Sequence, residues 1–272
     1  MPGKYFDYYA HLGDRLLPFL QGRRVAIEQR FPSSEKIVYR RHSGAAGEKS
    51  WICIDDRAAL LEWVRTYAEG FHAHIRAEGT GAWFVIDIDS RDLPTEMARL
   101  GAVDANAVLK EQGIAPLVKF SGSDGYHLML DVAEIGTIPD AELWELERGM
   151  VRSVACEVER RLGADPDAQP IRDAVGAGRP LVTTSSVDRE NSAALLFDEY
   201  ILKDNATLRA PYSVHPTTGL VSVPIPESEL ATFKPEHAAT DAVIAGWPDT
   251  VFPSYALTAV REALKAWRDH DC

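Results

Sequence analysis

Apolar and polar residues recur with two different periods along the chain, which predicts helices and short strands in mixed order. Steps of three and four residues over 5–20 predict a first helix. Asp56 stands where an N-cap is expected, and the helix after it is predicted to stop at Gly70. Residues 163–194 have little periodicity, which predicts an irregular connection with one short helix. The other predicted helices are 95–112, 139–162 and 254–267, and the predicted strands are 25–29, 36–40, 51–54, 82–89, 116–120 and 126–132.

The composition is that of a globular chain with a large core. Its 272 residues are 46% hydrophobic and 26% charged, which fits one or two domains of α/β or α+β organisation. Apolar stretches such as 82–86 are far shorter than the ~20 residues needed to cross a bilayer. The first residues lack the layout of a secretory signal. We therefore expect a cytoplasmic protein with no membrane partner.

The charge is acidic overall but uneven along the chain. Lys and Arg number 29 against 41 Asp and Glu, a net charge of -12, which argues against a large nucleic-acid footprint because phosphate contacts need basic side chains. Residues 23–49 carry seven basic and three acidic side chains, a net +4, so the remainder carries -16. This basic strip fits either a phosphate-binding segment or a solvated charged hairpin.

The segment WFVIDID combines a core strand with two carboxylates. Side chains two residues apart on a strand point the same way, so Asp87 and Asp89 share one face while Ile86 and Ile88 enter the core. Two such carboxylates raise each other's pKa unless a cation neutralises them. The oxygen ligands suit Mg²⁺, and the alternative is a strand that ends in solvated aspartates.

The segment SGSDGYHL, residues 121–128, predicts a tight turn between two strands. Gly122 and Gly125 allow backbone N–H groups to approach a ligand closely. Ser121 and His127 flank the turn, and their side chains add donors for phosphate oxygens. The alternative is an ordinary hairpin with a satisfied histidine.

A third group of polar residues lies within 197–225. Asp198 follows the apolar run 193–197, so it is placed to end a strand near the same metal. Arg209 precedes a Pro-rich segment that carries Ser213 and His215. A guanidinium and an imidazole near a triphosphate would supply the positive charge that three aspartates cannot.

Together and in this order, the three segments resemble the catalytic motifs of the archaeo-eukaryotic primase superfamily. APYSVHPTTGLVSVPI is similar to a stretch of the primase small subunit, while DYYAHLGDRLLPFLQGRRVAI and HIRAEG resemble the polymerase domain of bacterial ligase D. The resemblance covers 5–226. It implies that Asp87, Asp89 and Asp198 are catalytic and bind two Mg²⁺ or Mn²⁺ ions. The implied nucleotide contacts are Ser121, Gly122, Gly125, His127, Arg209, Ser213, His215 and, at the nucleotide or the rim, His74.

The resemblance also implies the architecture and the activity. The expected fold is one primase-polymerase domain over 1–272, of the archaeo-eukaryotic primase type. It would combine an N-terminal αβ module (1–80), a catalytic module with an RRM-like sheet (81–230) and a C-terminal helical tail (231–272). The implied activity is metal-dependent addition of nucleotides to a nucleic-acid 3′ end, in end joining, gap filling or priming. The implied ligands are nucleoside triphosphates and a DNA template-primer or broken DNA end.

Three features separate this chain from the relatives it resembles. Family members often place Arg or Lys inside the hairpin, whereas this chain has Ser123 and Asp124. His215 follows the primase pattern, since the ligase D relatives usually have Arg there. The three cysteines include no CxxC pair, and 90–119 is too short for the zinc-binding insertion of many primase small subunits, so no zinc is expected.

Two other functions compete with nucleotide addition. A DxD glycosyltransferase would also use two aspartates, but it leaves Asp198 and the His-Pro-x-Thr-Gly segment unexplained. A catalytically silent nucleic-acid-binding module would explain Asp124, but not the three retained aspartates. Candidate protein partners are Ku and a separate ligase, or a primase large subunit.

Overall fold

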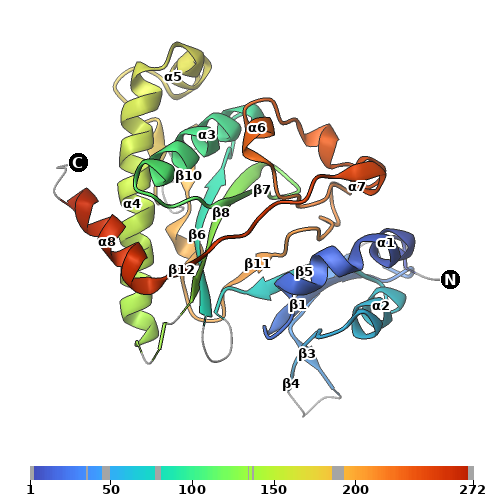
Figure 1. Cartoon of the computed structure of the whole chain (residues 1–272). Helices are drawn as coiled ribbons and strands as arrows, with labels where there is room; N and C mark the ends of the chain where they lie inside the picture. The colour runs from blue at the N-terminus through green and yellow to red at the C-terminus, as the bar shows by residue number, and fades with distance from the viewer. Residues whose placement is uncertain are drawn as a thin grey trace.

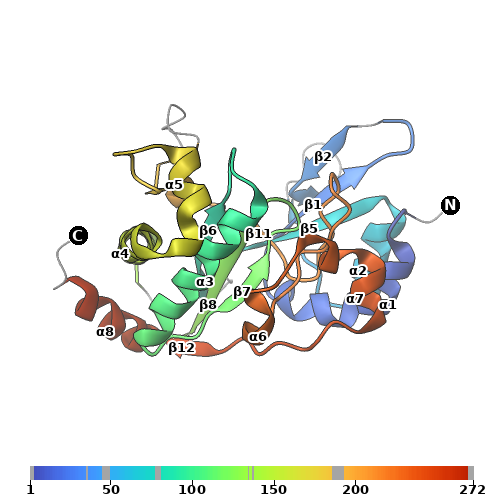
Figure 2. The same cartoon turned by 90° about the horizontal axis from the view of Figure 1, so that it is seen from above.

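A computed structural model of the chain describes residues 3–34, 36–44, 50–76, 81–133, 135–136, 138–185 and 193–268. Two sheets lie side by side, each with helices against it (Figure 1; Figure 2). The α-helices are α1 (Phe6–Leu16), α2 (Arg57–Arg65), α3 (Thr95–Glu111), α4 (Asp140–Ala164), α5 (Gln169–Val175), α6 (Glu227–Leu230), α7 (Thr240–Gly246) and α8 (Leu257–Arg268). The strands are β1 (Val25–Arg30), β2 (Ile37–Arg40), β3 (His42–Ser43), β4 (Ser50–Trp51), β5 (Ala68–His74), β6 (Gly81–Asp89), β7 (Leu117–Phe120), β8 (Gly125–Ala133), β9 (Val182–Thr183), β10 (Leu195–Phe197), β11 (Thr207–Arg209) and β12 (Ser254–Ala256).

The first sheet is antiparallel and has the order β11-β5-β1-β2. Helices α1 and α2 pack against each other beside this sheet (Figure 1). The ring of Tyr9 on α1 meets the ring of Phe71 on β5 edge to face, with 5.1 Å between centroids. The side chain of Asp56 accepts the N–H of Ala59 at 2.8 Å, so the predicted N-cap of α2 is confirmed.

The second sheet has the order β12-β8-β6-β10-β9, and β7 pairs with β8. Helices α3 and α4 contact this sheet. Gly101 on α3 lies against the side chain of Ile88, so the even-numbered residues of β6 face the helices. Asp87 and Asp89 therefore point to the opposite face of the sheet.

The predicted helix after Asp56 was too long, because a strand replaces its last turn. Helix α2 ends at Arg65, Tyr67 has a φ of 69°, and β5 follows at once. Gly70, which was expected to stop the helix, lies inside β5. Both edges of β5 pair with strands that are distant in the sequence, so tertiary pairing overrides the local helical pattern.

The sheets also cross the boundaries that the sequence predicted for the modules. Strand β11 comes from the predicted catalytic segment 81–230, yet it pairs with β5 of the N-terminal segment. Strand β12 comes from the predicted helical tail and pairs in parallel with β8. The irregular connection 163–194 contains α5 as its single described α-helix, together with the unpredicted strand β9.

The basic residues of 23–49 do not form one exposed strip. The guanidinium of Arg23 lies 3.8 Å from the centre of the Trp83 ring and is buried. Arg30 donates a hydrogen bond of 2.7 Å to the carbonyl oxygen of Pro216. Lys49 lies outside the described residues. None of the helices within the described ranges is long and apolar enough to span a membrane.

Candidate active site

A row of polar side chains crosses the second sheet. Lys119 on β7 lies directly opposite His127 on β8, and His127 lies directly opposite Asp87 on β6. Lys119 Nζ is 2.6 Å from His127 Nδ1, and His127 Nε2 is 3.1 Å from Asp87 Oδ1. Burial and the nearby cations Lys119 and Arg209 hold the pKa of His127 well below its usual range.

Three aspartates meet at one end of this row. The N–H of Asp198 donates to the carbonyl oxygen of Asp87 at 2.9 Å, and Leu196 of β10 pairs with Asp89. Burial, and then Asp198, raise the pKa of Asp87 to about 7. Burial, and then Asp87, raise that of Asp89 to about 8. These shifts have the sign expected for partly buried carboxylates that share a site without a counter-ion.

The donor set of this cluster suits a hard divalent cation, because all three side chains offer carboxylate oxygens. Asp87 Oδ1 is buried and has no hydrogen-bond partner, so its contact with His127 is electrostatic rather than an aligned hydrogen bond. Asp198 Oδ1 instead accepts the N–H of Tyr200 at 2.8 Å. Within the described ranges, no three His, Cys, Asp or Glu side chains form a ready-made metal cage. The carboxylates would therefore have to turn toward a shared ion.

The hairpin between β7 and β8 is fitted closely to its surroundings. Ser121 Oγ accepts hydrogen bonds from the N–H groups of Ser123 and Gly125, so the Ser121 hydroxyl stabilises the turn. Gly122 has a φ of 92°. A Cβ on Gly122 would lie 3.0 Å from the Cβ of His215, and one on Gly125 would lie 2.6 Å from Asp89 Oδ1. The glycines therefore bring the hairpin against both His215 and the aspartates.

Asp124 adds a fourth acid near the cluster. Its side chain is exposed, and its charge helps to raise the pKa of Asp87 and of Asp89. Its backbone carbonyl accepts the hydroxyl of Ser90 at 2.9 Å, which fixes the turn beside the end of β6. The negative hairpin residue noted in the sequence therefore lies close enough to act on the same charges.

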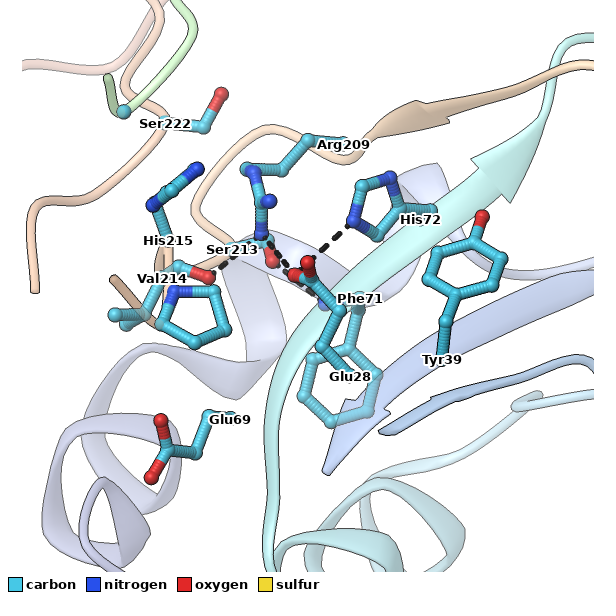
Figure 3. A network of polar contacts seen from close by, with 12 residues as sticks. Glu28, Tyr39, Glu69, Phe71, His72, Arg209, Ser213, Val214, His215 and Ser222 are labelled. Atoms are coloured by element: carbon cyan, nitrogen blue, oxygen red, sulfur yellow. Dashed lines mark hydrogen bonds and ion pairs between the residues drawn. The ribbon is translucent and has the colours of Figure 1, made fainter. Parts of the chain in front are cut away.

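Arg209 is bound within a buried polar network (Figure 3). Its Nη1 is 2.6 Å from Glu28 Oε2 and donates to the carbonyl oxygen of Val214 at 2.9 Å. His72 Nε2 lies 3.1 Å from the same Glu28 oxygen. Burial alone would raise the pKa of Glu28, but His72 and Arg209 outweigh it and lower that pKa to about 2. We predicted that the Arg209 guanidinium contacts the triphosphate, but in the structure it is paired with the Glu28 carboxylate.

Gly70 makes room for this ion pair. A Cβ on Gly70 would lie 2.4 Å from Glu28 Oε2 and 2.7 Å from Arg209 Nη1. The next residue, Phe71, donates its N–H to Ser213 Oγ at 2.7 Å. Ser213 is fully buried, so this predicted nucleotide contact joins β5 to the segment before His215.

The two remaining predicted histidines lie in different places. His215 is near the hairpin, and burial and Arg209 lower its pKa. His74 lines a cavity of about 480 Å³ together with Arg24, Arg76 and Trp144, and none of the three aspartates lines it. The structure thus joins the aspartates, the hairpin and His215, whereas His74 lies beside a separate cavity.

Three further residues near the site, Lys119, Glu28 and His72, were not predicted from the sequence. Lys119 lies in an otherwise apolar strand, LVKF, and this isolated charge was the one signal that could have shown it. Nothing in the sequence pairs Glu28 with Arg209, because they lie far apart along the chain.

The chain is similar to known proteins in sequence and in fold. Residues 3–247 match the family described as LigD, primase-polymerase domain. Among solved structures, the chain is similar to the "Polymerase Domain from Mycobacterium tuberculosis Ligase D in complex with DNA". That likeness has 19% sequence identity and a TM-score of 0.66, and it covers 88% of this chain and 86% of the other. It confirms the predicted α+β fold, and the family match confirms the predicted primase-polymerase domain. No curated protein sequence matches the chain.

Proposed function

The chain belongs to the LigD primase-polymerase domain family, and on this premise we propose that it adds nucleotides to a nucleic-acid 3′ end with the help of divalent metal ions. The proposed substrates are a nucleoside triphosphate and a gapped or broken DNA end, in the repair setting that the family description suggests. Ku and a separate ligase are the partners that we propose for that setting.

One observation carries the proposal. Asp87 and Asp89 on β6 lie together with Asp198, which directly follows the paired strand β10, next to a glycine hairpin and His215. A DxD glycosyltransferase would use Asp87 and Asp89, but Asp198 and the hairpin would have no role in its reaction. Nucleotidyl transfer uses all of them, because it needs both metal ligands and donors for a triphosphate.

Each group then has a stated role in the proposed reaction. The aspartates would hold Mg²⁺ or Mn²⁺, which lowers the pKa of the attacking 3′-hydroxyl and neutralises the triphosphate and the leaving pyrophosphate. The hairpin N–H groups, His127 and His215 would face the phosphates. Arg209 is engaged by Glu28 and the Val214 carbonyl, so we assign it to positioning the neighbouring His215 rather than to a direct phosphate contact.

The test is extension of a labelled primer on a gapped duplex that carries a 5′-phosphate, with ribonucleotides and deoxyribonucleotides offered separately. Wild-type protein should extend the primer with Mg²⁺ or Mn²⁺, whereas the double variant Asp87→Ala, Asp89→Ala should not. Asp173→Ala is the matched control, because Asp173 is exposed on α5 and accepts a hydrogen bond from Gln169 of the same helix. A primer-free template in the same assay separates priming from gap filling.

A catalytically silent nucleic-acid-binding module is the second candidate, and Asp124 is the observation that favours it. An acid beside the phosphate hairpin opposes triphosphate binding, because like charges repel. Binding of the gapped duplex without any extension under all metal conditions would support this candidate and contradict nucleotide addition.

A further inference from the structure

We propose that Lys119 is a positioning residue, which holds the His127 imidazole in one orientation and one tautomer with its Nε2–H toward Asp87. The proposal rests on the proposed function only for what His127 then does, namely offer the same Nε2–H to the nucleotide phosphates. The contact itself stands on the geometry of the polar row.

The hydrogen bonds of Ser222 make Lys119 a donor on one side and leave it a further N–H for His127. Ser222 Oγ donates its single proton to the carbonyl oxygen of Phe120 at 2.8 Å. Ser222 Oγ also lies 2.7 Å from Lys119 Nζ. Because its own proton is already used, this hydroxyl oxygen accepts a hydrogen bond from the amine. In either charge state the amine has a second N–H available for His127 Nδ1, which is 2.6 Å away.

This direction selects the tautomer of His127. If Nδ1 accepts from Lys119, the proton of the neutral imidazole is on Nε2. Nε2 lies 3.1 Å from Asp87 Oδ1, and an N–H is favourable there, whereas a lone pair would face a carboxylate. Both ends of the ring therefore favour the same tautomer.

Burial of Lys119 has no evident structural advantage. Its side chain is fully buried, and the amine meets an imidazole and a hydroxyl rather than a carboxylate. Burial and the charge of Arg209 hold the pKa of the Lys119 amine well below its ordinary value. A buried amine without a directly paired anion is costly, and a methionine of similar shape would avoid that cost. This cost is understandable if the amine serves the neighbouring site.

The first experiment observes the tautomer directly. Proton–nitrogen NMR spectra of the ring nitrogens, with His127 assigned by comparison with His127→Gln, should show the Nε2–H tautomer alone in the wild-type protein. In Lys119→Met only the contact with Asp87 still favours this tautomer, so we expect the Nδ1–H tautomer to become detectable beside the Nε2–H tautomer. This measurement needs no substrate, so it is independent of whether the protein adds nucleotides. An unchanged single tautomer in Lys119→Met would overturn the proposal.

The second experiment separates positioning from scaffolding. Lys119→Met should lower kcat/KM for nucleotide addition by about tenfold to a hundredfold, the effect of a misplaced group, while Tm stays the same or rises. The double variant Lys119→Met, His127→Gln should lose no more activity than His127→Gln alone, because Lys119 acts through His127. Additive losses, or a fall in Tm that accounts for the lost activity, would contradict the proposal. A wild-type protein without activity would instead refute the proposed function.

Two further variants complete the design. Lys110→Met removes a surface lysine that pairs with Glu227, and it should leave both the tautomer and the activity unchanged. If Lys119→Met does not fold, Ser222→Ala takes its place, because it removes only the hydroxyl that orients Nζ. Ser222→Ala should then bring the second tautomer into view, and its failure to do so would overturn the proposal.

Discussion

The N–H of Asp198 donates a hydrogen bond of 2.9 Å to the carbonyl oxygen of Asp87. This single backbone contact places the third acid beside the DxD strand. Burial and the charge of Asp198 together raise the pKa of Asp87, so the metal-free cluster is under electrostatic strain. The strain should be measurable in the stability of the protein.

The first prediction concerns the charge of Asp87. Its pKa of about 7 lies above the unfolded value of about 4, so the folded state binds the proton more tightly. The metal-free protein should therefore lose stability as pH rises from about 4 to about 7. Asp87→Asn should flatten that loss in thermal unfolding with a chelator present. Added Mg²⁺ should raise the Tm of the wild type at pH 8 and leave that of Asp87→Asn unchanged.

The second prediction concerns the space at Gly70. The added Cβ of Gly70→Ala would meet both members of the Glu28–Arg209 pair, so we expect a loss of about 1–3 kcal/mol in the free energy of unfolding. Because Arg209 also holds the Val214 carbonyl, nucleotide KM should rise as His215 shifts. Urea unfolding and steady-state kinetics measure the two effects.

Gly149→Ala is the matched control for Gly70→Ala. Gly149 lies within α4, and a Cβ there would have no atom within 4 Å. Its replacement should stabilise the protein by roughly 0.5–1 kcal/mol. If Gly70→Ala behaved in the same way, the proposed requirement for space beside Glu28 would be wrong.

The third prediction concerns the acid in the hairpin. Asp124→Asn should lower nucleotide KM and the Mg²⁺ or Mn²⁺ concentration for half-maximal activity, because the side chain adds negative charge where phosphates are proposed to bind. Asp124→Arg should extend both effects. Nucleotide titrations at several metal concentrations measure them, with Asp173→Asn as the control. Unchanged values in both Asp124 variants would mean that this acid does not act on the bound nucleotide.

The fourth prediction concerns pH and His72. Burial and Arg209 lower the pKa of His72 to about 4, below its unfolded value of about 6.5. The folded state therefore binds this proton more weakly, and the stability is complete above about pH 6.5 and lost as pH falls toward about 4. His72→Gln should remove this part of the acid sensitivity in urea unfolding at pH 4 to 7. His11→Gln, at an exposed position on α1, should keep it.

The sequence by itself determined the features that depend on near neighbours. The common face of Asp87 and Asp89 follows from the period of a strand, and the N-cap at Asp56 follows from a contact within one helical turn. The hairpin before His127 follows from its glycines and the strands on either side. Such features need only the dihedral preferences and side chains of a few consecutive residues.

Only the tertiary structure decided which distant groups meet. Gly70 was expected to stop a helix, but it lies inside β5, whose two edges pair with β1 and β11. Arg209 was expected to be available to a triphosphate, but Glu28 on another strand lies 2.6 Å from it. Lys119 acquired its role from His127 and Ser222, which reach it from two other segments. The charge balance of a buried group depends on what surrounds it in space, and the local sequence does not record that environment.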